Sequence, residues 1–275
     1  MAEHGSGGGD KDALWSVLTS AGRPWRPLAA GDCLLAIDDT DNLDSRGTGF
    51  RARELALELA QHDLARPVGV TRHQLLVDPR IPYTSHNSAA CLMLTEVGDA
   101  QALFDYGKAY LSRASAAGSD AGIAVARFGQ VSEKVRAWGR RAQREVLDKA
   151  SAYALGRAEG LLMEELTGEG IGVIGALAAV GLNHEGDDGR CLWVRGLREA
   201  AGTVIDAATL EAMAGIAVRT LDGTRVCDAK ARIDLGQWPR AVFKESRPIL
   251  LVEENVDGTS DAEWRVVGRE LIKRH

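Results

Sequence analysis

The sequence predicts an α/β fold, with a catalytic α/β region followed by a smaller β-rich C-terminal segment. Short apolar runs alternate with stretches of helical periodicity, and loops rich in glycine or acidic residues separate them. Over 275 residues, 45% are apolar and 26% are charged, which is ordinary globular composition. We expect a flexible tail over residues 1–11, an α/β region over 12–182 and a β-rich module over 183–275.

The first predicted strand is the apolar run 34–37, which lies between Gly31-Asp32 and an acidic loop. After that loop, apolar residues at helical spacing predict a helix over 51–62 that packs back on the sheet. Prolines at 79 and 82 forbid regular pairing and predict a loop over 78–88. The same criteria predict strands at 67–77, 89–96 and 123–128 and a helix at 100–116.

The second half begins with the longest helical stretch, 133–165, where we expect two helices broken near Ser151. A glycine loop then opens an apolar helix at 174–180. Turn signals divide the remainder into short β-like runs at 191–194, 215–220, 225–233 and 249–253.

Charge and cysteine usage exclude several classes of protein. A net charge of −6 argues against broad attraction to nucleic acid or anionic membranes, so any polyanion must be met locally. The four cysteines lie far apart without a CxxC pair, which indicates neither a zinc knuckle nor a disulfide framework. No apolar run approaches the roughly 20 residues of a membrane-spanning helix. We expect a soluble cytoplasmic protein whose oligomeric state the sequence does not reveal.

Three carboxylates, those of Asp38, Asp39 and Asp41, follow the first predicted strand. In open α/β sheets, ligands bind outside the carboxyl ends of strands. Carboxylates this close repel one another unless a cation compensates, and Mg²⁺ is usually held by one or two carboxylates together with phosphate oxygens. We interpret the loop as a catalytic Mg²⁺ site, and the alternative is a solvated acidic turn that caps the next helix.

Gly47-Thr48-Gly49 follows the acidic loop and directly precedes a predicted helix. Glycines let backbone N–H groups approach a phosphate, and the start of a helix adds its positive dipole end. A threonine hydroxyl can bind metal or accept a phosphoryl group, so these residues are candidates for nucleotide binding and Thr48 for catalysis. Most such tripeptides taken alone are turns.

A second glycine loop contains G-x-G-x-x-G at Gly170, Gly172 and Gly175. The motif follows a helix rather than a strand, which excludes the dinucleotide-binding fingerprint. Two interpretations stay open: Gly170 and Gly172 face a nucleotide phosphate at a helix start, or the glycines permit close helix packing.

The polar run 83–88 precedes an apolar segment. Such runs serve either as turns and caps or as a loop that contacts the substrate. In the second case Tyr83, Ser85, His86 and Asn87 bind substrate, with His86 as a donor or proton carrier.

Arg136, Arg140 and Arg144 recur at helical spacing in an otherwise acidic protein. The favoured interpretation is a solvated face paired with Glu133, Glu145 and Asp148. The alternative is an edge that binds a substrate phosphate or an RNA backbone.

Taken together and in this order, three motifs resemble the archaeal tRNA-isoleucine agmatidine synthetase family. They are Ile37-Asp38-Asp39-Thr40-Asp41 with the downstream Thr48, the proline-containing run 78–85, and the glycine-rich run 170–179. The similarity covers roughly residues 32–182. Where the family has a Lys-Thr-Arg-Gly-Asn run, this sequence has Thr84 to Ser88.

The resemblance implies a kinase-like catalytic domain with a ferredoxin-like part, which uses ATP and Mg²⁺ to join agmatine to a wobble cytidine of tRNA. It implies that Asp38, Asp39 and Asp41 hold metal and phosphates, and it places Thr48 on the family's phosphorylatable threonine. The sequence has no cysteine cluster for the family's zinc ribbon and no clear basic oligonucleotide-binding barrel. We therefore expect an ATP-dependent kinase- or ligase-type enzyme acting on a small-molecule acceptor. The alternatives are a tRNA-modifying enzyme and a non-catalytic nucleotide-binding regulator.

Overall fold

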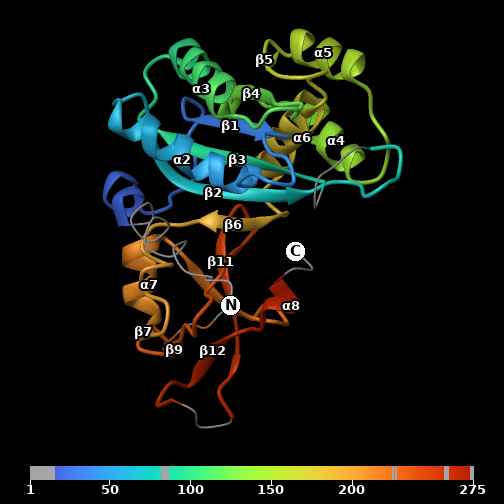
Figure 1. Cartoon of the computed structure of the whole chain (residues 1–275). Helices are drawn as coiled ribbons and strands as arrows, with labels where there is room; N and C mark the ends of the chain where they lie inside the picture. Colours follow the sequence, from blue (N-terminus) through green and yellow to red (C-terminus); the bar gives the residue numbers. More distant parts are fainter. Residues whose placement is uncertain (1–15, 82–86, 225, 227, 257–259, 273–275) are drawn as a thin grey trace, which may run out of the picture.

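The computed structural model describes residues 16–81, 87–224, 226, 228–256 and 260–272. The predicted tail over residues 1–11 lies outside these ranges. Helices cover both faces of a sheet in one part of the molecule, and a smaller part built around the long strand β11 lies against its edge (Figure 1). None of the described helices is long and apolar enough to cross a membrane.

The elements alternate through the first two thirds of the chain and become mostly strands after β6. The helices are α2 (Thr48–Gln61), α3 (Ala100–Ala114), η1 (Phe128–Gln130), α4 (Glu133–Ala142), α5 (Lys149–Ala158), α6 (Gly172–Glu185), α7 (Ala207–Ala214) and α8 (Arg269–Ile272). The strands are β1 (Cys33–Asp38), β2 (Arg66–Gln74), β3 (Ser88–Thr95), β4 (Gly122–Arg127), β5 (Leu162–Glu165), β6 (Arg190–Trp193), β7 (Val204–Asp206), β8 (Ala217–Thr220), β9 (Arg232–Asp234), β10 (Val242–Lys244), β11 (Arg247–Glu254) and β12 (Trp264–Val266).

The strands pair in the order β5-β4-β1-β3-β2-β6-β10-β11-β12-β9-β7, and β8 pairs with β11. Strand β1 lies between β3 and β4 and runs antiparallel to both. Strand β11 is parallel to β8, and β12 is parallel to β9. The predicted α/β class is confirmed, as a mixed sheet. Because the neighbours of β1 are antiparallel, the rule for parallel sheets does not by itself explain a site at the end of this strand.

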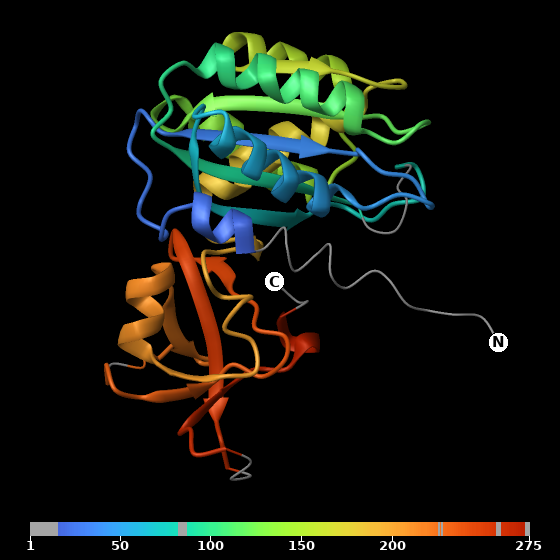
Figure 2. The same ribbon diagram turned by 60° about the vertical axis from the view of Figure 1, so that its left-hand side comes forward.

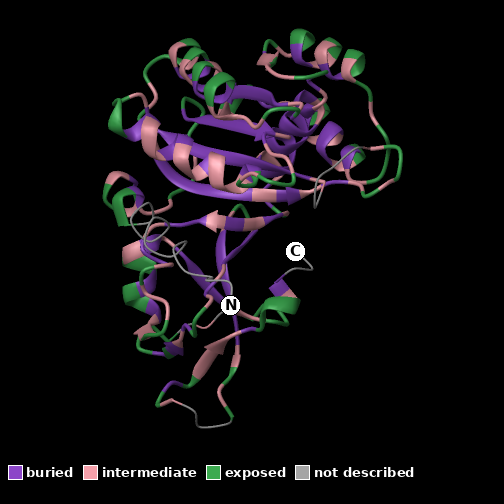
Figure 3. Ribbon diagram, in the orientation of Figure 1, coloured by how far each residue is buried: buried purple, intermediate pink, exposed green. Residues whose placement is uncertain are grey.

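Alternation along β1 divides the core between the two faces of the sheet. Leu34 and Ala36 belong to the apolar cluster beneath α6 and α4, whereas Leu35 and Ile37 belong to the cluster beneath α2 and α3. The central strands are therefore buried on both sides (Figure 3). This two-sided burial explains why β1 is apolar without interruption until Asp38, where it reaches the edge of the layers.

Strand β6 connects the two parts of the molecule, because it pairs with β2 on one side and with β10 on the other. Beyond it, the long strand β11 leads away from the helix-covered part, with α7 and α8 on opposite sides (Figure 2). Ile249, Leu251 and Ile272 contribute to a separate small apolar cluster there.

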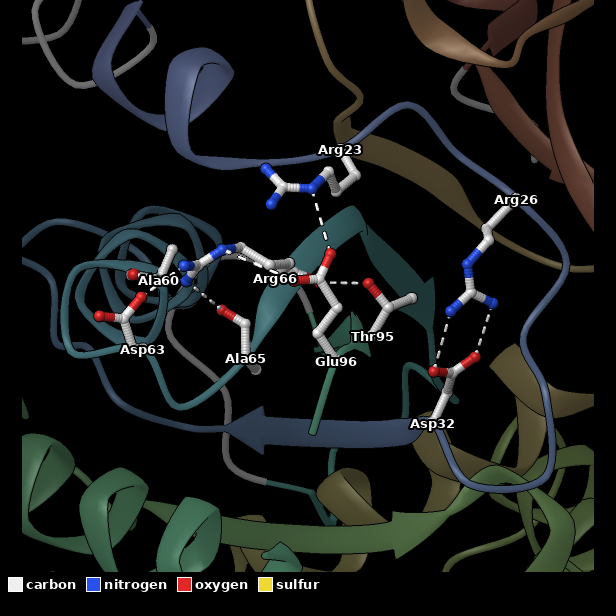
Figure 4. Close-up of polar contacts among 9 residues, drawn as sticks. All are labelled: Arg23, Arg26, Asp32, Ala60, Asp63, Ala65, Arg66, Thr95 and Glu96. Carbon is white, nitrogen blue, oxygen red and sulfur yellow. Dashed lines mark hydrogen bonds and ion pairs between the residues drawn. The ribbon is translucent and has the colours of Figure 1, made fainter. Parts of the chain in front are cut away.

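The start of β1 and the connections at that end of the sheet are held by charged side chains in matched pairs (Figure 4). Arg26 donates to both carboxylate oxygens of Asp32, at 2.8 and 3.1 Å, and Arg23 donates to Glu96 at 3.1 Å. Each of these guanidinium groups has an acidic partner, which is the usual state of an arginine in a folded protein.

Most predicted elements of the first half are present, and the helical stretch 133–165 is the main error. Its break lies at 143–148 rather than near Ser151, because the Asp148 side chain accepts a hydrogen bond from the backbone N–H of Ser151 and starts α5. Residues 162–165 form strand β5 instead of helix, since they pair with the open edge of β4. Helix α7, which Asp206 caps, was not predicted from the sequence.

Candidate active site

A pocket opens at the carboxyl end of β1, between the start of α2 and the start of α6. Its empty space amounts to about 970 Å³, counting the part open to solvent. Charged and polar side chains form the polar wall of its lining, and side chains such as Leu147, Ile171 and Ile174 form the apolar wall. The lining residues are Asp38, Asp39, Asp41, Gly47, Thr48, Gly49, Arg72, Leu75, Ile81, Asn87, Ser88, Ala90, Ala142, Glu145, Leu147, Ile171, Gly172, Ile174 and Gly175.

Asp38 is the last residue of β1 and is only 9% exposed. Its Oδ1 accepts a hydrogen bond from the backbone N–H of Asp39 at 2.9 Å. Burial raises the pKa of this carboxyl to about 8, and repulsion from Asp39 and Asp41 adds to the effect while Arg72 opposes it. Asp38 is therefore protonated near neutral pH unless a cation compensates its charge.

Asp39 adopts a left-handed backbone conformation, with φ of 51°. This conformation is uncommon for residues with a side chain, although aspartate adopts it more readily than most, and such residues are enriched at functional sites. Burial raises the pKa of Asp39 to about 6, with further contributions from the negative charges of Asp120 and Asp41. Two adjacent carboxyls thus share a region of excess negative charge.

Asp41 and Thr48 form a tight pair at the start of α2. The Thr48 hydroxyl donates to Oδ1 of Asp41 at 2.7 Å, and the Thr48 backbone N–H donates to the same oxygen at 3.1 Å. The Thr48 hydroxyl oxygen also accepts from the backbone N–H and the hydroxyl of Thr40, at 3.2 and 3.1 Å. Asp41 therefore caps the helix and is positioned to take the Thr48 proton.

Binding of Mg²⁺ by Asp38, Asp39 and Asp41 together stays a prediction. Among the described residues, no group of three or more His, Cys, Asp or Glu side chains is arranged to hold a metal ion. Asp41 lines the same pocket and accepts the hydrogen bond from the Thr48 hydroxyl. Two carboxyls with raised pKa and too few compensating donors still fit Mg²⁺, which needs only one or two carboxylates when phosphates complete its shell.

The second glycine loop serves close packing. The N–H groups of Gly170 and Gly172 already donate within the loop, to Thr167 O and Asp120 O respectively. A Cβ on Gly172 would lie 2.7 Å from the Asp38 carbonyl oxygen, and a Cβ on Gly175 only 1.9 Å from Asp38 Oδ2. Of the two interpretations left open by the sequence, the contacts favour the second: these glycines let α6 pass directly over the end of β1.

The remaining predicted residues divide between the pocket and the undescribed segment. Gly47 and Gly49 line the pocket beside Thr48. Asn87 also lines it, but its side-chain amide donates to Leu76 O at 2.6 Å and so joins the end of the loop to the segment that follows β2. Tyr83, Ser85 and His86 lie outside the described residues, and their assignment to substrate stays a prediction.

Sequence reasoning missed two charged residues near the aspartates. Arg72, on β2, lies in the pocket wall and donates to the Ser88 hydroxyl at 2.7 Å. Asp120 precedes β4 next to the end of β1, and its carboxylate accepts from Gly170 N–H at 3.2 Å. No local motif marks these positions, because only the pairing of β2, β3 and β4 around β1 brings them to the site.

Two arginines of the predicted stripe, Arg136 and Arg140, are paired as the favoured interpretation predicted, whereas Arg144 lies beyond the end of α4. Arg136 forms an ion pair with Glu133 at 2.7 Å, and Arg140 pairs with both Glu133 and Glu185. Asp148 was predicted as a partner and instead caps α5. The alternative, an anion-binding edge on this helix, therefore loses its main support.

No family model and no curated protein matches the chain. Several solved structures are similar to it. These are structures of TiaS, the agmatidine synthetase of an isoleucine tRNA. The TiaS complex with tRNA and ATP is 28% identical and the TiaS complex with tRNA, AMPCPP and agmatine 26% identical, each over 55% of this chain and 36% of that one, with a TM-score of 0.47. Apo TiaS is 25% identical, with the same TM-score, over 35% of its length. The chain thus spans about a third of these proteins, and TiaS is the family that the three motifs resemble.

Proposed function

We propose that this protein is an Mg²⁺-dependent, ATP-using enzyme that activates an acceptor for ligation or group transfer. The observation that carries the proposal is the pair Asp38 and Asp39 at the polar wall of the pocket. Both have a raised pKa and the second has a strained backbone, which is the environment expected of carboxylates that hold a metal-bound polyphosphate.

Each wall of the pocket has a role in this proposal. Asp38 and Asp39 hold Mg²⁺, which neutralises phosphate charge when bound. Arg72 faces the same phosphates from β2. The apolar wall, which includes Leu147, Ile171 and Ile174, provides a surface for the adenine ring. Catalysis then consists mainly of positioning and of charge stabilisation.

Thr48 is the proposed phosphoacceptor or phosphate-positioning group. Its hydroxyl proton points at Asp41 Oδ1, 2.7 Å away, so Asp41 can accept that proton when the oxygen attacks phosphorus. The hydroxyls and carboxylates that would take part all lie within one loop and the first turn of α2, which explains the dense acidic and glycine composition of residues 38–49.

We propose a nucleotide of an RNA as the acceptor, in place of the small molecule that the overall charge suggested. The acidic net charge describes the whole surface, whereas several arginines gather beside the pocket, starting at Arg72. The motif resemblance to a tRNA-modifying family over residues 32–182 supports the same acceptor. A non-catalytic regulator is less well supported, because a strained Asp39 and a proton-sharing Thr48–Asp41 pair suit turnover.

The proposal is tested by following ATP labelled at the α or the γ phosphate in the presence of bulk tRNA, with and without added amines. We expect RNA-stimulated release of pyrophosphate or phosphate that requires Mg²⁺, and loss of that release in Asp39→Asn. Turnover that responds to a metabolite and not to RNA would support the small-molecule acceptor. ATP binding without turnover under every condition would support a regulator.

A further inference from the structure

Arginines from six separate segments converge on the junction between the two parts of the molecule. The central member is Arg190 on β6, which is the direct cross-strand partner of Arg72 on β2. Directly opposed residues of antiparallel strands have neighbouring side chains, so these two positive charges lie next to each other. We call the group the arginine cluster; it consists of Arg53, Arg72, Arg190, Arg198, Arg240 and Arg269.

Aromatic and backbone contacts hold two members in place. The guanidinium groups of Arg240 and Arg269 lie over the ring of Trp238, at 4.8 and 5.3 Å from its centroid. Arg240 Nη1 also donates to the carbonyl oxygen of Leu192 at 3.0 Å. Cation–π stacking of this kind orders an arginine without neutralising it.

Two members of the cluster, Arg72 and Arg53, lie at the catalytic pocket. Arg72 lines the pocket, and a Cβ on Gly49, another pocket residue, would lie 3.8 Å from Arg53 Nη1. Arg198 and Arg240 line a second, smaller hollow at β6, of about 230 Å³ counting the part open to solvent.

Mutual repulsion agrees with this arrangement. Burial and the charges of Arg240 and Arg198 lower the pKa of Arg53 to about 10. Burial likewise lowers the pKa of Arg240 to about 10, with contributions from the remaining arginines of the cluster near it, Arg198, Arg190 and Arg269. The pKa of Arg190 is lowered by burial and by Arg269.

Four arginines of the cluster differ from others in the chain because they have no acidic partner. Within the part of the chain that the structure describes, no carboxylate forms an ion pair with Arg190, Arg198, Arg240 or Arg269. Arg26 and Arg140, by contrast, each have one. Uncompensated like charges destabilise a fold, so their accumulation in an acidic protein indicates an anionic ligand.

We propose that the arginine cluster binds the phosphodiester backbone of a single RNA strand and so directs its acceptor nucleotide into the pocket. This inference rests on the proposed function and names the residues that grip its substrate. A strand presents one negative charge at each nucleotide, so several of its phosphates can meet the six arginines of the cluster. A free phosphate would occupy only one or two of them.

The test measures anisotropy of a fluorescent RNA stem-loop at several KCl concentrations, without ATP. The informative variant is Arg190→Gln with Arg269→Gln, because neither side chain has a hydrogen-bond partner among the described residues. We expect affinity to fall at least about tenfold and the slope of log K against log[KCl] to shrink by roughly 1.4, at about 0.7 for each phosphate that is no longer neutralised. Arg190→Lys with Arg269→Lys should keep most of the slope.

The matched control is Arg136→Gln with Arg140→Gln, which removes the same charge from paired arginines on α4. Equal loss of RNA affinity in the two Gln double variants, or no loss in either, overturns the proposal. Binding of inorganic tripolyphosphate together with no measurable RNA binding also overturns the proposal, and it assigns the cluster to free phosphates. A parallel Mg²⁺–ATP titration separates the two proposals: wild-type protein that binds RNA through the cluster but binds no ATP refutes only the proposed function.

Discussion

The raised pKa of Asp38 predicts an unusual stability profile for Asp38→Asn. In the folded protein burial raises this pKa from 3.8 to about 8, whereas the unfolded chain has the ordinary value. A carboxyl with a raised pKa contributes stability below its unfolded pKa, and this stability is lost as pH rises toward the folded pKa. Between pH 5 and pH 8 the wild-type protein therefore loses free energy of unfolding that Asn, which has no charge, does not lose.

The magnitude follows from the width of that interval. Each pH unit changes the free energy of unfolding by at most about 1.36 kcal/mol. From pH 5 to pH 8, the difference in free energy of unfolding between variant and wild type therefore changes by at most about 4 kcal/mol. Asn can keep the hydrogen bond from Asp39 N–H, because its carbonyl oxygen can occupy the position of Oδ1. In the absence of metal, we expect the free energy of unfolding of Asp38→Asn, relative to that of wild type, to rise steadily from pH 5 to pH 8.

Urea denaturation at pH 5, 6, 7 and 8 measures this difference through the midpoint and slope of each transition. The control is Asp148→Asn, at an exposed helix cap where hydrogen bonds to Ser151 lower the pKa of the carboxyl. Its contribution is complete above the unfolded pKa, so its effect should stay constant over the same interval. If the free energy of unfolding of Asp38→Asn relative to wild type stays constant or falls as pH rises, Asp38 does not have the raised pKa of a buried carboxyl.

Three further outcomes follow from the same geometry. Gly175→Ala should lower the free energy of unfolding in urea by about 1–3 kcal/mol and abolish ATP binding, because its Cβ would lie 1.9 Å from Asp38 Oδ2. Gly31→Ala, with open space around it, should change neither the stability nor the binding. Thr48→Val should retain ATP binding but lose turnover by at least about a hundredfold in a product assay, and Thr48→Ser should restore part of it. The affinity for Mg²⁺–ATP should rise from pH 6 to pH 8, with protons released on binding in calorimetry. The reason is that the metal needs the ionised forms of Asp39 and Asp38, whose pKa values are about 6 and 8. An affinity that falls over that range would contradict the assignment.

How far the sequence predicts this molecule depends on whether local or long-range contacts decide each feature. The run 34–37 is apolar because both faces of β1 are covered, so its strand could be predicted, and the helix after Gly47 follows from simple periodicity. Strand β5 could not be predicted, because the open edge of β4 and not the sequence of residues 162–165 makes it a strand.

The site shows the same division. Asp38, Asp39, Asp41 and Thr48 are close in sequence, and one loop brings them to the pocket. Arg72 and the rest of the arginine cluster are far apart in sequence, so their convergence depends on the pairing of β2 with β6. For the same reason the local stripe on α4 was the only basic feature visible in the sequence, although its charges are neutralised in the fold.

The central claim is that Asp38 and Asp39 form a metal-dependent ATP site, and calorimetric titration of ATP with and without Mg²⁺ tests it most directly. The account predicts saturable binding that requires Mg²⁺ in the wild-type protein and is lost in Asp39→Asn, while Arg136→Gln, remote from the pocket, binds as wild type does. Binding that is the same with and without metal, or that survives in Asp39→Asn, would contradict it.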